Sequence, residues 1–138
     1  MAYKDTFIKV APDSDATTGT TPTSNRKTTP IHIHQYNLLM DNPYTYTHED
    51  LVYEVHVLRQ GFSPEDLAAR EVEIKRDLFS KGHPCMRASS LTKKYGWGAH
   101  YNEDGKIALY AIDSDEYRKY IESATDVIDA MRSKRKRD

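Results

Sequence analysis

The 138-residue chain has only one cysteine, Cys85, and no apolar run that approaches the roughly 18 residues of a membrane-spanning helix. A single cysteine excludes an intrachain disulfide framework and is typical of a reducing compartment. The N-terminal residues also lack the long apolar segment of a secretion signal. These absences predict a cytoplasmic protein.

The chain also has almost no net charge: it contains 20 basic and 21 acidic residues, and its formal charge is −1. This balance gives no global electrostatic field toward nucleic acid or a membrane, so neither is an expected partner. The exception is the mainly basic segment 132–138, which we expect to be a mobile, solvated tail. An accessory nucleic-acid binder that acts through this tail is kept as a functional alternative.

Aromatic residues are few apart from tyrosine: the chain has ten tyrosines, three phenylalanines and one tryptophan. Tyrosine buries its ring and keeps its hydroxyl near water, which suits half-exposed sheet faces and binding surfaces. A hydrophobic fraction of 38% allows one compact core of the size typical of a single domain. We therefore predict one domain over residues 1–138.

The N-terminal third combines a short strand, a long loop and a segment of ambiguous periodicity. Residues 6–11 are β-prone and predict a strand, whereas residues 13–30 are rich in Thr, Ser and Pro and predict a long loop. Thr29 and Pro30 resemble a helix start, which favours a helix over residues 31–40. The first four residues of that segment alternate in polarity, so a strand is the competing interpretation.

The middle of the chain predicts two amphipathic helices. The first follows a capping-box pattern at Thr47 and stops at Gly61, and the second begins after Ser63 and ends at Gly82. Their apolar stripes are Leu51, Val52, Val55 and Leu58 in the first helix, and Leu67, Ile74, Leu78 and Phe79 in the second.

In the C-terminal half the hydrophobic period changes to two. Residues 95–101 and 106–112 flank a four-residue turn that ends in glycine, which predicts a β-hairpin. Ser114 then caps a helix that we expect to continue to Met131. Its expected inner face is Tyr117, Tyr120, Ile121, Ala124, Ile128 and Met131.

Together these elements predict an α+β fold. We expect a small antiparallel sheet centred on the hairpin, joined by the strand at residues 6–11 and covered by three to four helices. Strands and helices do not alternate regularly along the chain, which argues against a doubly wound parallel sheet.

Several segments resemble a known family. The sequence SLTKKYGWGAH at residues 90–100, followed by GKIALY at 105–110, is similar to the signature of an uncharacterised, mainly bacterial family of small proteins, known only as a domain of unknown function. The likeness extends to TFIKVAPD at residues 6–13 and MRSKR at 131–135. It implies a bacterial, cytosolic, stand-alone domain that includes the threonine-rich loop, and it brings no established activity or catalytic residue.

Cys85 is the candidate nucleophile. His83 and Arg87 each lie two residues away, and such groups can favour a reactive thiolate. The spacing does not match a cysteine-phosphatase loop, and free cysteines are commonly inert apolar residues. We assign no catalytic residue, and a small enzyme that uses Cys85 or a histidine site is the second functional alternative.

The six histidines match no metal-site spacing. His32 and His34 would share a face only on a strand, whereas on a helix they point about 200° apart. We therefore predict no metal site and no cofactor.

The first hairpin strand carries the main candidate for a binding surface. Gly96 and Gly98 flank Trp97, and glycine inside a strand often marks a close approach of backbone or ligand. Aromatic rings with cations beside them can stack a planar anion. The candidate binding residues are Arg87, Lys93, Tyr95, Trp97 and His100.

The competing interpretation of this strand is structural: the glycines let a helix pack closely while Trp97 fills the core. Weighing both, we predict a non-catalytic domain that binds a small ligand or a protein partner through the hairpin face at residues 95–101.

Overall fold

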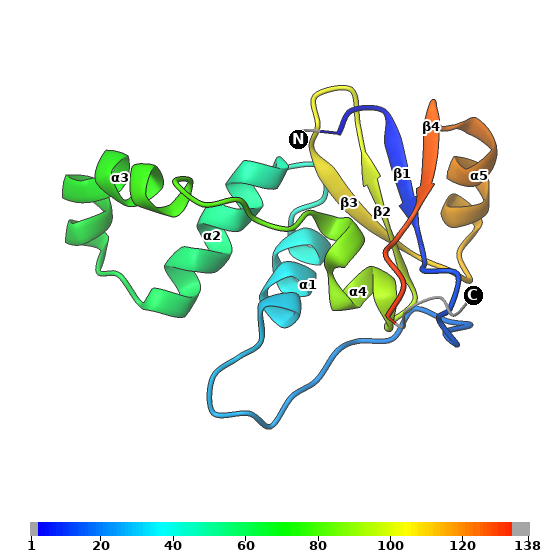
Figure 1. The fold of residues 1–138 in the computed structure, drawn as a ribbon, viewed down its shortest axis with the longest axis horizontal. Helices are drawn as coiled ribbons and strands as arrows, with labels where there is room; N and C mark the ends of the chain where they lie inside the picture. Colours follow the sequence, from blue (N-terminus) through cyan, green and yellow to red (C-terminus); the bar gives the residue numbers. More distant parts are fainter. Residues whose placement is uncertain (1–2, 134–138) are drawn as a thin grey trace.

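The computed structural model describes residues 3–133 and contains five α-helices, a short 3-10 helix and four strands (Figure 1). The α+β class predicted from the sequence is confirmed. Most of the basic segment 132–138 lies outside the described residues, so its mobility and its contacts with nucleic acid stay predictions.

The strands form one sheet in the order β3-β2-β1-β4. β2 (Trp97–Tyr101) and β3 (Ile107–Ala111) make the predicted antiparallel hairpin, and β1 (Thr6–Lys9) lies antiparallel to β2. The hairpin turn contains Gly105, whose φ of 77° favours glycine.

The fourth strand is the main difference from the predicted fold. β4 (Asp126–Asp129) pairs in parallel with β1, so the sheet is mixed rather than wholly antiparallel. The predicted helix to Met131 is wrong beyond the end of α5 (Asp115–Ser123). An open edge of β1 carries unpaired backbone groups that a strand can satisfy. Val127 and Ile128 also pack into different core clusters, which only an extended segment allows.

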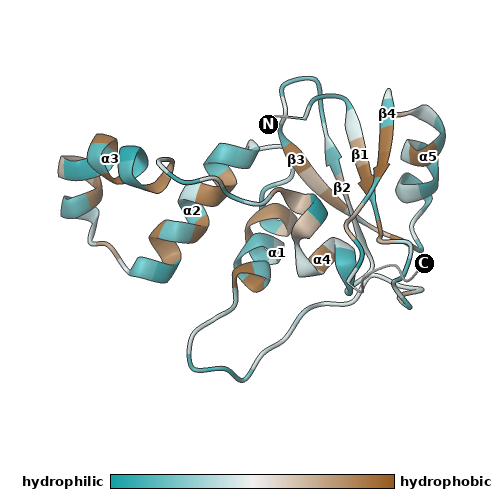
Figure 2. Ribbon diagram, in the orientation of Figure 1, coloured by the Kyte–Doolittle hydropathy of each residue, from teal (hydrophilic) through white to brown (hydrophobic). Residues whose placement is uncertain are grey.

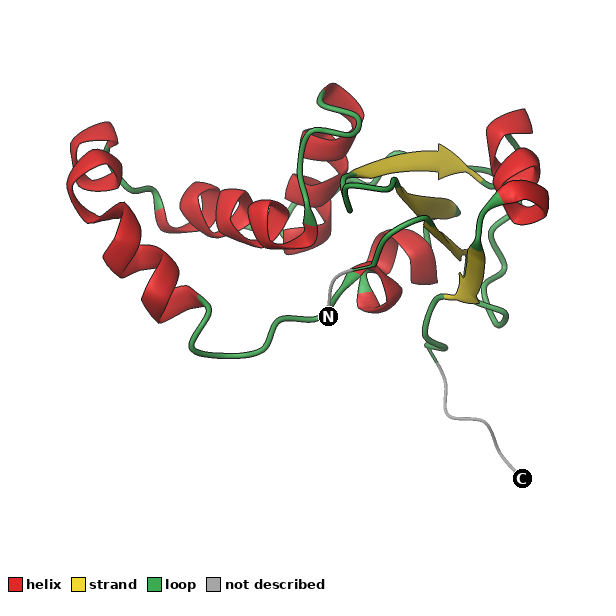
Figure 3. Cartoon of the chain, turned by 90° about the horizontal axis from the view of Figure 1, so that it is seen from above, coloured by secondary structure: helices red, strands yellow, loops and turns green. Residues whose placement is uncertain are grey.

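The two faces of the sheet bury different sets of side chains. We call the face covered by α1, α4 and the start of α2 the large face, and the face covered by α5 the small face (Figures 1 and 3). Figure 2 shows hydrophobic residues along β1, β3 and β4. The larger buried cluster includes Ile8, Leu39, Leu51, Val55, Met86, Leu91, Trp97, Tyr101, Ile107 and Leu109. The small-face cluster is built on Phe7, Val10 and Tyr117.

Two consecutive helices cross the large-face side. α1 (Ile31–Asp41) confirms the helical interpretation over the strand. α2 (His48–Gln60) begins with the predicted capping box between Thr47 and Asp50, and Gly61 ends it in the left-handed conformation. No helix among residues 3–133 is long and apolar enough to cross a lipid bilayer.

A compact segment after α3 returns the chain to the sheet. It contains a 3-10 helix, η1 (Met86–Ala88), and the short helix α4 (Ser90–Lys93). Thr92 is completely buried, and its hydroxyl donates to the Met86 carbonyl at 2.5 Å. This buried hydrogen bond joins the two short helices to each other, and Met86 and Leu91 pack the segment into the large-face cluster.

α3 (Pro64–Leu78) starts at its predicted cap, Ser63, but it does not cover the sheet. Together with α2 it forms an arm that extends away from the strands (Figure 1). Ile74 is its one buried residue, and Val72 is 80% exposed. Most of the stripe predicted for this helix therefore lies outside the core.

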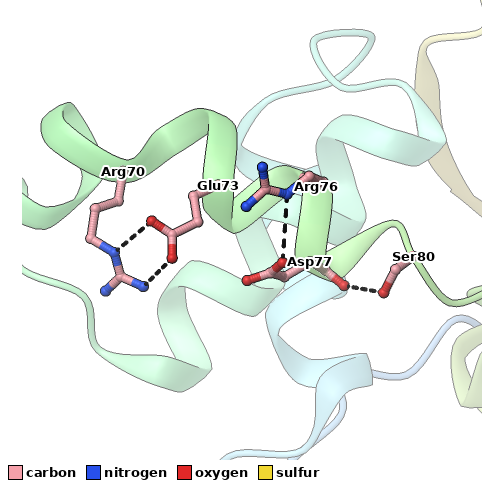
Figure 4. Close-up of polar contacts among 5 residues, drawn as sticks. All are labelled: Arg70, Glu73, Arg76, Asp77 and Ser80. Atoms are coloured by element: carbon pink, nitrogen blue, oxygen red, sulfur yellow. Dashed lines mark hydrogen bonds and ion pairs between the residues drawn. The ribbon is translucent and has the colours of Figure 1, made fainter.

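Polar contacts run along the exposed surface of α3 (Figure 4). Arg70 pairs with Glu73 at 3.3 Å and Arg76 with Asp77 at 3.9 Å, and the Ser80 hydroxyl donates to the Asp77 carbonyl at 2.6 Å. The Arg70–Glu73 pair joins residues three apart on one helix face, and exposed pairs with this spacing add a small stabilisation to the helix. Capping and local pairing, more than burial, hold this helix.

Residues 13–30 form neither helix nor strand, as predicted, yet part of the loop packs on the body. The Thr20 N–H donates to the Tyr95 carbonyl at 2.9 Å, and the Trp97 indole N–H donates to the Thr20 carbonyl at 2.9 Å. The loop therefore covers the edge of the Trp97 ring.

Candidate ligand-binding cleft

A cleft of about 350 Å³ lies between α1, α2 and the segment 78–90. Small-molecule sites typically span roughly 300–1,000 Å³ and have a mainly apolar lining with a few polar groups. The apolar lining residues are Ile31, Val52, Val55, Leu78, Pro84 and Ala88, and the polar ones are His32, Gln35, His56, Arg59, Gln60, His83, Cys85, Ser89 and Ser90.

Helical spacing brings these side chains to the cleft. On α2, Val52, His56 and Arg59 are separated by four and three residues and therefore share one face. On α1, His32 and Gln35 are three apart and also share a face. Two short-range patterns thus supply two walls of one cavity.

Ser89 ties the third wall to α1. Its hydroxyl oxygen accepts the backbone N–H of Leu91 at 3.2 Å, which caps α4. The same hydroxyl donates to the Gln35 side-chain oxygen at 2.7 Å. Because Ser89 is buried, this bond is shielded from water and holds the cleft walls in register.

His32 is the most unusual group in the cleft. Its ring stacks on Tyr95, with centroids 5.2 Å apart and planes inclined by 22°. Its Nε2 atom is buried and has no hydrogen-bond partner. Burial lowers the pKa of His32, and the positive charges of Arg26 and Lys94 lower it further. Buried polar atoms are normally paired, so the unpaired Nε2 marks a place beside the cleft where a hydrogen-bond partner is missing.

Basic side chains, and no carboxylates among the described residues, line the cleft. Arg59, His56 and His83 line it, whereas within the described part of the chain no Asp or Glu does. Burial lowers the pKa of His56, and the nearby His83 adds to this effect. His83 is itself positioned by a 2.7 Å hydrogen bond between Nε2 and the Leu78 carbonyl. The cleft therefore favours an anionic group over a cationic one.

Three histidines and Cys85 line the same cleft without forming a metal site. Among residues 3–133, no three His, Cys, Asp or Glu side chains come together closely enough to hold a metal ion. The Cys85 sulfur lies 3.9 Å from the Tyr3 hydroxyl, and the two side chains are hydrogen-bonded. This contact gives no support to a nucleophilic role.

The five binding residues predicted from the sequence do not form one surface. Trp97 is 7% exposed and packs edge-on against Tyr36 at 5.3 Å within the large-face core. A Cβ atom at Gly98 would lie 2.4 Å from Phe7 Cζ and 2.8 Å from Tyr117 Cε2. This geometry matches the structural interpretation of the strand, in which glycine admits a closely packed helix.

The other four predicted residues lie in different places. Tyr95 contacts the cleft through His32, and Lys93 is half-buried in α4. The Arg87 Nε donates to the Asp129 carbonyl at 2.9 Å and so fastens the end of β4. His100 belongs to the small face, where it stacks on the α5 residue Tyr120.

His32, His56 and Arg59 were not singled out as a binding set from the sequence. The sequence feature that could have indicated them is helical spacing. They lie on two predicted helices, and His56 and Arg59 are three residues apart on one of them. Which faces of these helices meet depends on their crossing, and one sequence does not encode that in any local pattern.

One family model matches residues 1–136, that of a family of unknown function (DUF6157). This confirms the predicted membership of a family of unknown function, whereas the bacterial origin that the resemblance implies stays a prediction. Neither a curated protein nor a solved structure shows a significant match to the chain.

Proposed function

The chain belongs to this family of unknown function, DUF6157, and we propose that it is a binding domain for a small organic anion with an apolar body. The site is the cleft between α1, α2 and the segment 78–90. The observation that carries the proposal is the buried, unpartnered Nε2 of His32 in a cleft that no acidic side chain of residues 3–133 lines.

Each part of such a ligand has a counterpart in the cleft. Val52, Val55 and Ile31 offer apolar surface for the body of the molecule. An N–H on His32 Nε2 donates to one oxygen of the anion, and Arg59 contributes a positive charge. The ligand supplies the hydrogen bond that His32 lacks, which offsets part of the cost of its burial.

The proposal fixes the sign of the pH dependence. The pKa of His32 is lowered in the free protein, and a bound anion stabilises the imidazolium and so raises that pKa. Binding then takes up a proton, and affinity increases as pH falls from 8 toward 5.5. Arg26 and Lys94 oppose this protonation by repulsion, and Asp and Glu are not among the described residues that line the cleft.

The direct test is calorimetric titration of the full chain with hexanoate, hexanamide and hexylamine, which share a six-carbon skeleton and differ in charge. We expect hexanoate to bind at least about tenfold more tightly than the other two, consistent with a charge-assisted hydrogen bond. Equal affinities, or a preference for hexylamine, would contradict the proposal.

Matched variants locate the site. His32→Phe keeps the stack on Tyr95 and removes the nitrogen, and we expect it to weaken hexanoate about tenfold. Arg59→Gln, at an exposed position, should weaken it about fivefold. Asn37→Ala, at an exposed position on the same helix outside the cleft lining, is the control and should leave binding unchanged. Loss of affinity in the control as large as in His32→Phe would place binding elsewhere.

The proposal locates this function in the cytoplasm. Cys85 is a free thiol, and free cysteines are typical of proteins in a reducing compartment. Cell fractionation with an antibody against the protein tests this point, and recovery in a secreted fraction would refute it.

A further inference from the structure

A second site stands on the small face, around the imidazole of His100. Its Nδ1 is 2.8 Å from the Tyr44 hydroxyl. The ring lies almost flat on Tyr120, with centroids 3.8 Å apart and planes inclined by 21°. A hydrogen bond and a stacking contact thus fix both the position and the rotation of a half-buried imidazole.

The Tyr44 hydroxyl is the centre of a polar network. Besides His100, it is 2.9 Å from the Tyr110 hydroxyl and 3.3 Å from that of Tyr120. The network gathers groups from the loop before α2, from β2, β3 and α5. Its members are held together although they are distant in sequence, so the arrangement depends on the complete fold.

Backbone strain is concentrated at the same place. Among the described residues, the two non-glycine residues with positive φ are Tyr44, at 56°, and Asp5, at 49°. One bonds to His100, and the other lines the hollow beside it. Left-handed conformations of residues such as tyrosine cost free energy, and they cluster at functional sites.

The second nitrogen of His100 is open. In residues 3–133 no side chain or backbone group bonds to Nε2, and Nε2 is not one of the buried atoms without a partner, so solvent reaches it. His100 lines a hollow of about 120 Å³ together with Asp5, Ser123 and Thr125. Ser123 is the last residue of α5, and the C-terminal end of a helix carries partial negative charge.

We propose that this hollow binds a primary ammonium group. Nε2 of His100 accepts one N–H of the ammonium, and the carboxylate of Asp5 balances its charge. The Nδ1–H of His100 donates to the Tyr44 oxygen, which leaves the Nε2 lone pair facing the ligand. A hollow of about 120 Å³ has room for a methylammonium-sized group, and a quaternary ammonium is disfavoured because it has no N–H to donate to Nε2.

The charge state of His100 agrees with this role. Burial lowers its pKa, and the Asp5 carboxylate opposes that shift without reversing it. The imidazole is therefore neutral at pH 7 and can accept a hydrogen bond, which an imidazolium cannot. The proposal is independent of the anion cleft, which lies on the other side of the sheet.

The first test is the tautomer of His100 in the intact protein, read from its ¹⁵N side-chain chemical shifts at pH 7.5. The proposal requires the proton on Nδ1 and an unprotonated Nε2. A proton on Nε2 would overturn it, because no lone pair would then face the hollow.

The second test is a titration with methylammonium chloride, with tetramethylammonium chloride as the bulky comparison at equal ionic strength. We expect a saturable shift of the His100 ring signals with methylammonium only. Asp5→Asn removes the charge and keeps a residue that tolerates positive φ, and it should weaken binding about fivefold. Asp104→Asn, an exposed carboxylate in the hairpin turn, is the matched control and should not change it. No saturable shift in the wild type, or equal weakening in both variants, would overturn the proposal.

Discussion

His32 and His100 lie on opposite sides of one sheet, and the charges near them have opposite signs. Burial lowers the pKa of both, but the charges near His32 are the cations Arg26 and Lys94, whereas the charge near His100 is the carboxylate of Asp5. His32 has a buried nitrogen with no partner, and His100 has one nitrogen fixed by Tyr44 and one in solvent. The two proposals therefore assign opposite ligand charges to the two sites because the neighbouring charges differ, although the imidazole is the same.

The two faces also differ in how they are held together. On the large face three helices bury a broad cluster of aliphatic side chains together with the rings of Trp97 and Tyr101. On the small face a single nine-residue helix packs through rings and hydroxyls. Substitutions at two consecutive residues of β2 test the two faces separately. The Trp97 side chain packs on the large face, whereas a side chain added at Gly98 would point to the small face.

The largest effect is expected from Trp97→Ala on the large face. It removes a buried ring and its hydrogen bond to Thr20, and it should lower the free energy of unfolding by about 3–5 kcal/mol. Urea unfolding followed by circular dichroism measures this loss. Val72→Ala, at a position 80% exposed, is the control and should stay within about 0.5 kcal/mol of wild type. A small loss for Trp97→Ala would mean that the ring is a surface group available to ligands.

Gly98→Ala is the corresponding change on the small face, with an intermediate effect. The new methyl group would meet the rings of Phe7 and Tyr117, so overpacking should lower the free energy of unfolding by about 1–3 kcal/mol. The same substitution in a Phe7→Leu background should cost less, since Phe7 makes the closest contact. Equal costs in both backgrounds would show that Phe7 is not what limits the space.

The smallest change in the free energy of unfolding is expected from a change of pH. His32, His34, His48, His56 and His100 all have pKa values lowered in the folded state from the usual 6.5, with burial as the main cause. The unfolded chain therefore binds more protons, and stability present above pH 6.5 is lost as pH falls through the folded pKa values.

Thermal unfolding between pH 7.5 and 5.5 measures this loss as a fall in Tm. His32→Phe should flatten the dependence by removing the contribution of the cleft, and hexanoate should flatten it in the wild type by stabilising protonated His32. A Tm that rises on acidification would contradict the lowered pKa values. A Tm profile unaffected by hexanoate would separate His32 from the anion site.

Much of the local structure could be predicted from the sequence. The helix starts at Thr47 and Ser63, the stop at Gly61 and the hairpin turn before Ile107 depend on neighbouring residues, so their signals are short-range. Side chains alternate along β2, so Trp97 and His100 lie on opposite faces of the sheet. The prediction that both contribute to one binding surface did not take this alternation into account.

The candidate cleft could be predicted only in part. Placing His32 on a helix followed from Pro30 and the apolar residues after it, but its burial follows from α1 meeting α2 and Tyr95. The same holds for Asp5 and His100, which are far apart in the chain and line one hollow.

The caps, the hairpin and the long loop could be read from the sequence, because each rests on residues close along the chain, and the α+β class followed from the order of these elements. The strand at residues 126–129, the position of α3 away from the sheet and the oppositely charged surroundings of two histidines became known only from how the chain packs. Those features depend on which strand edges and helix faces pack together, and the free energy of that packing is a property of the whole fold.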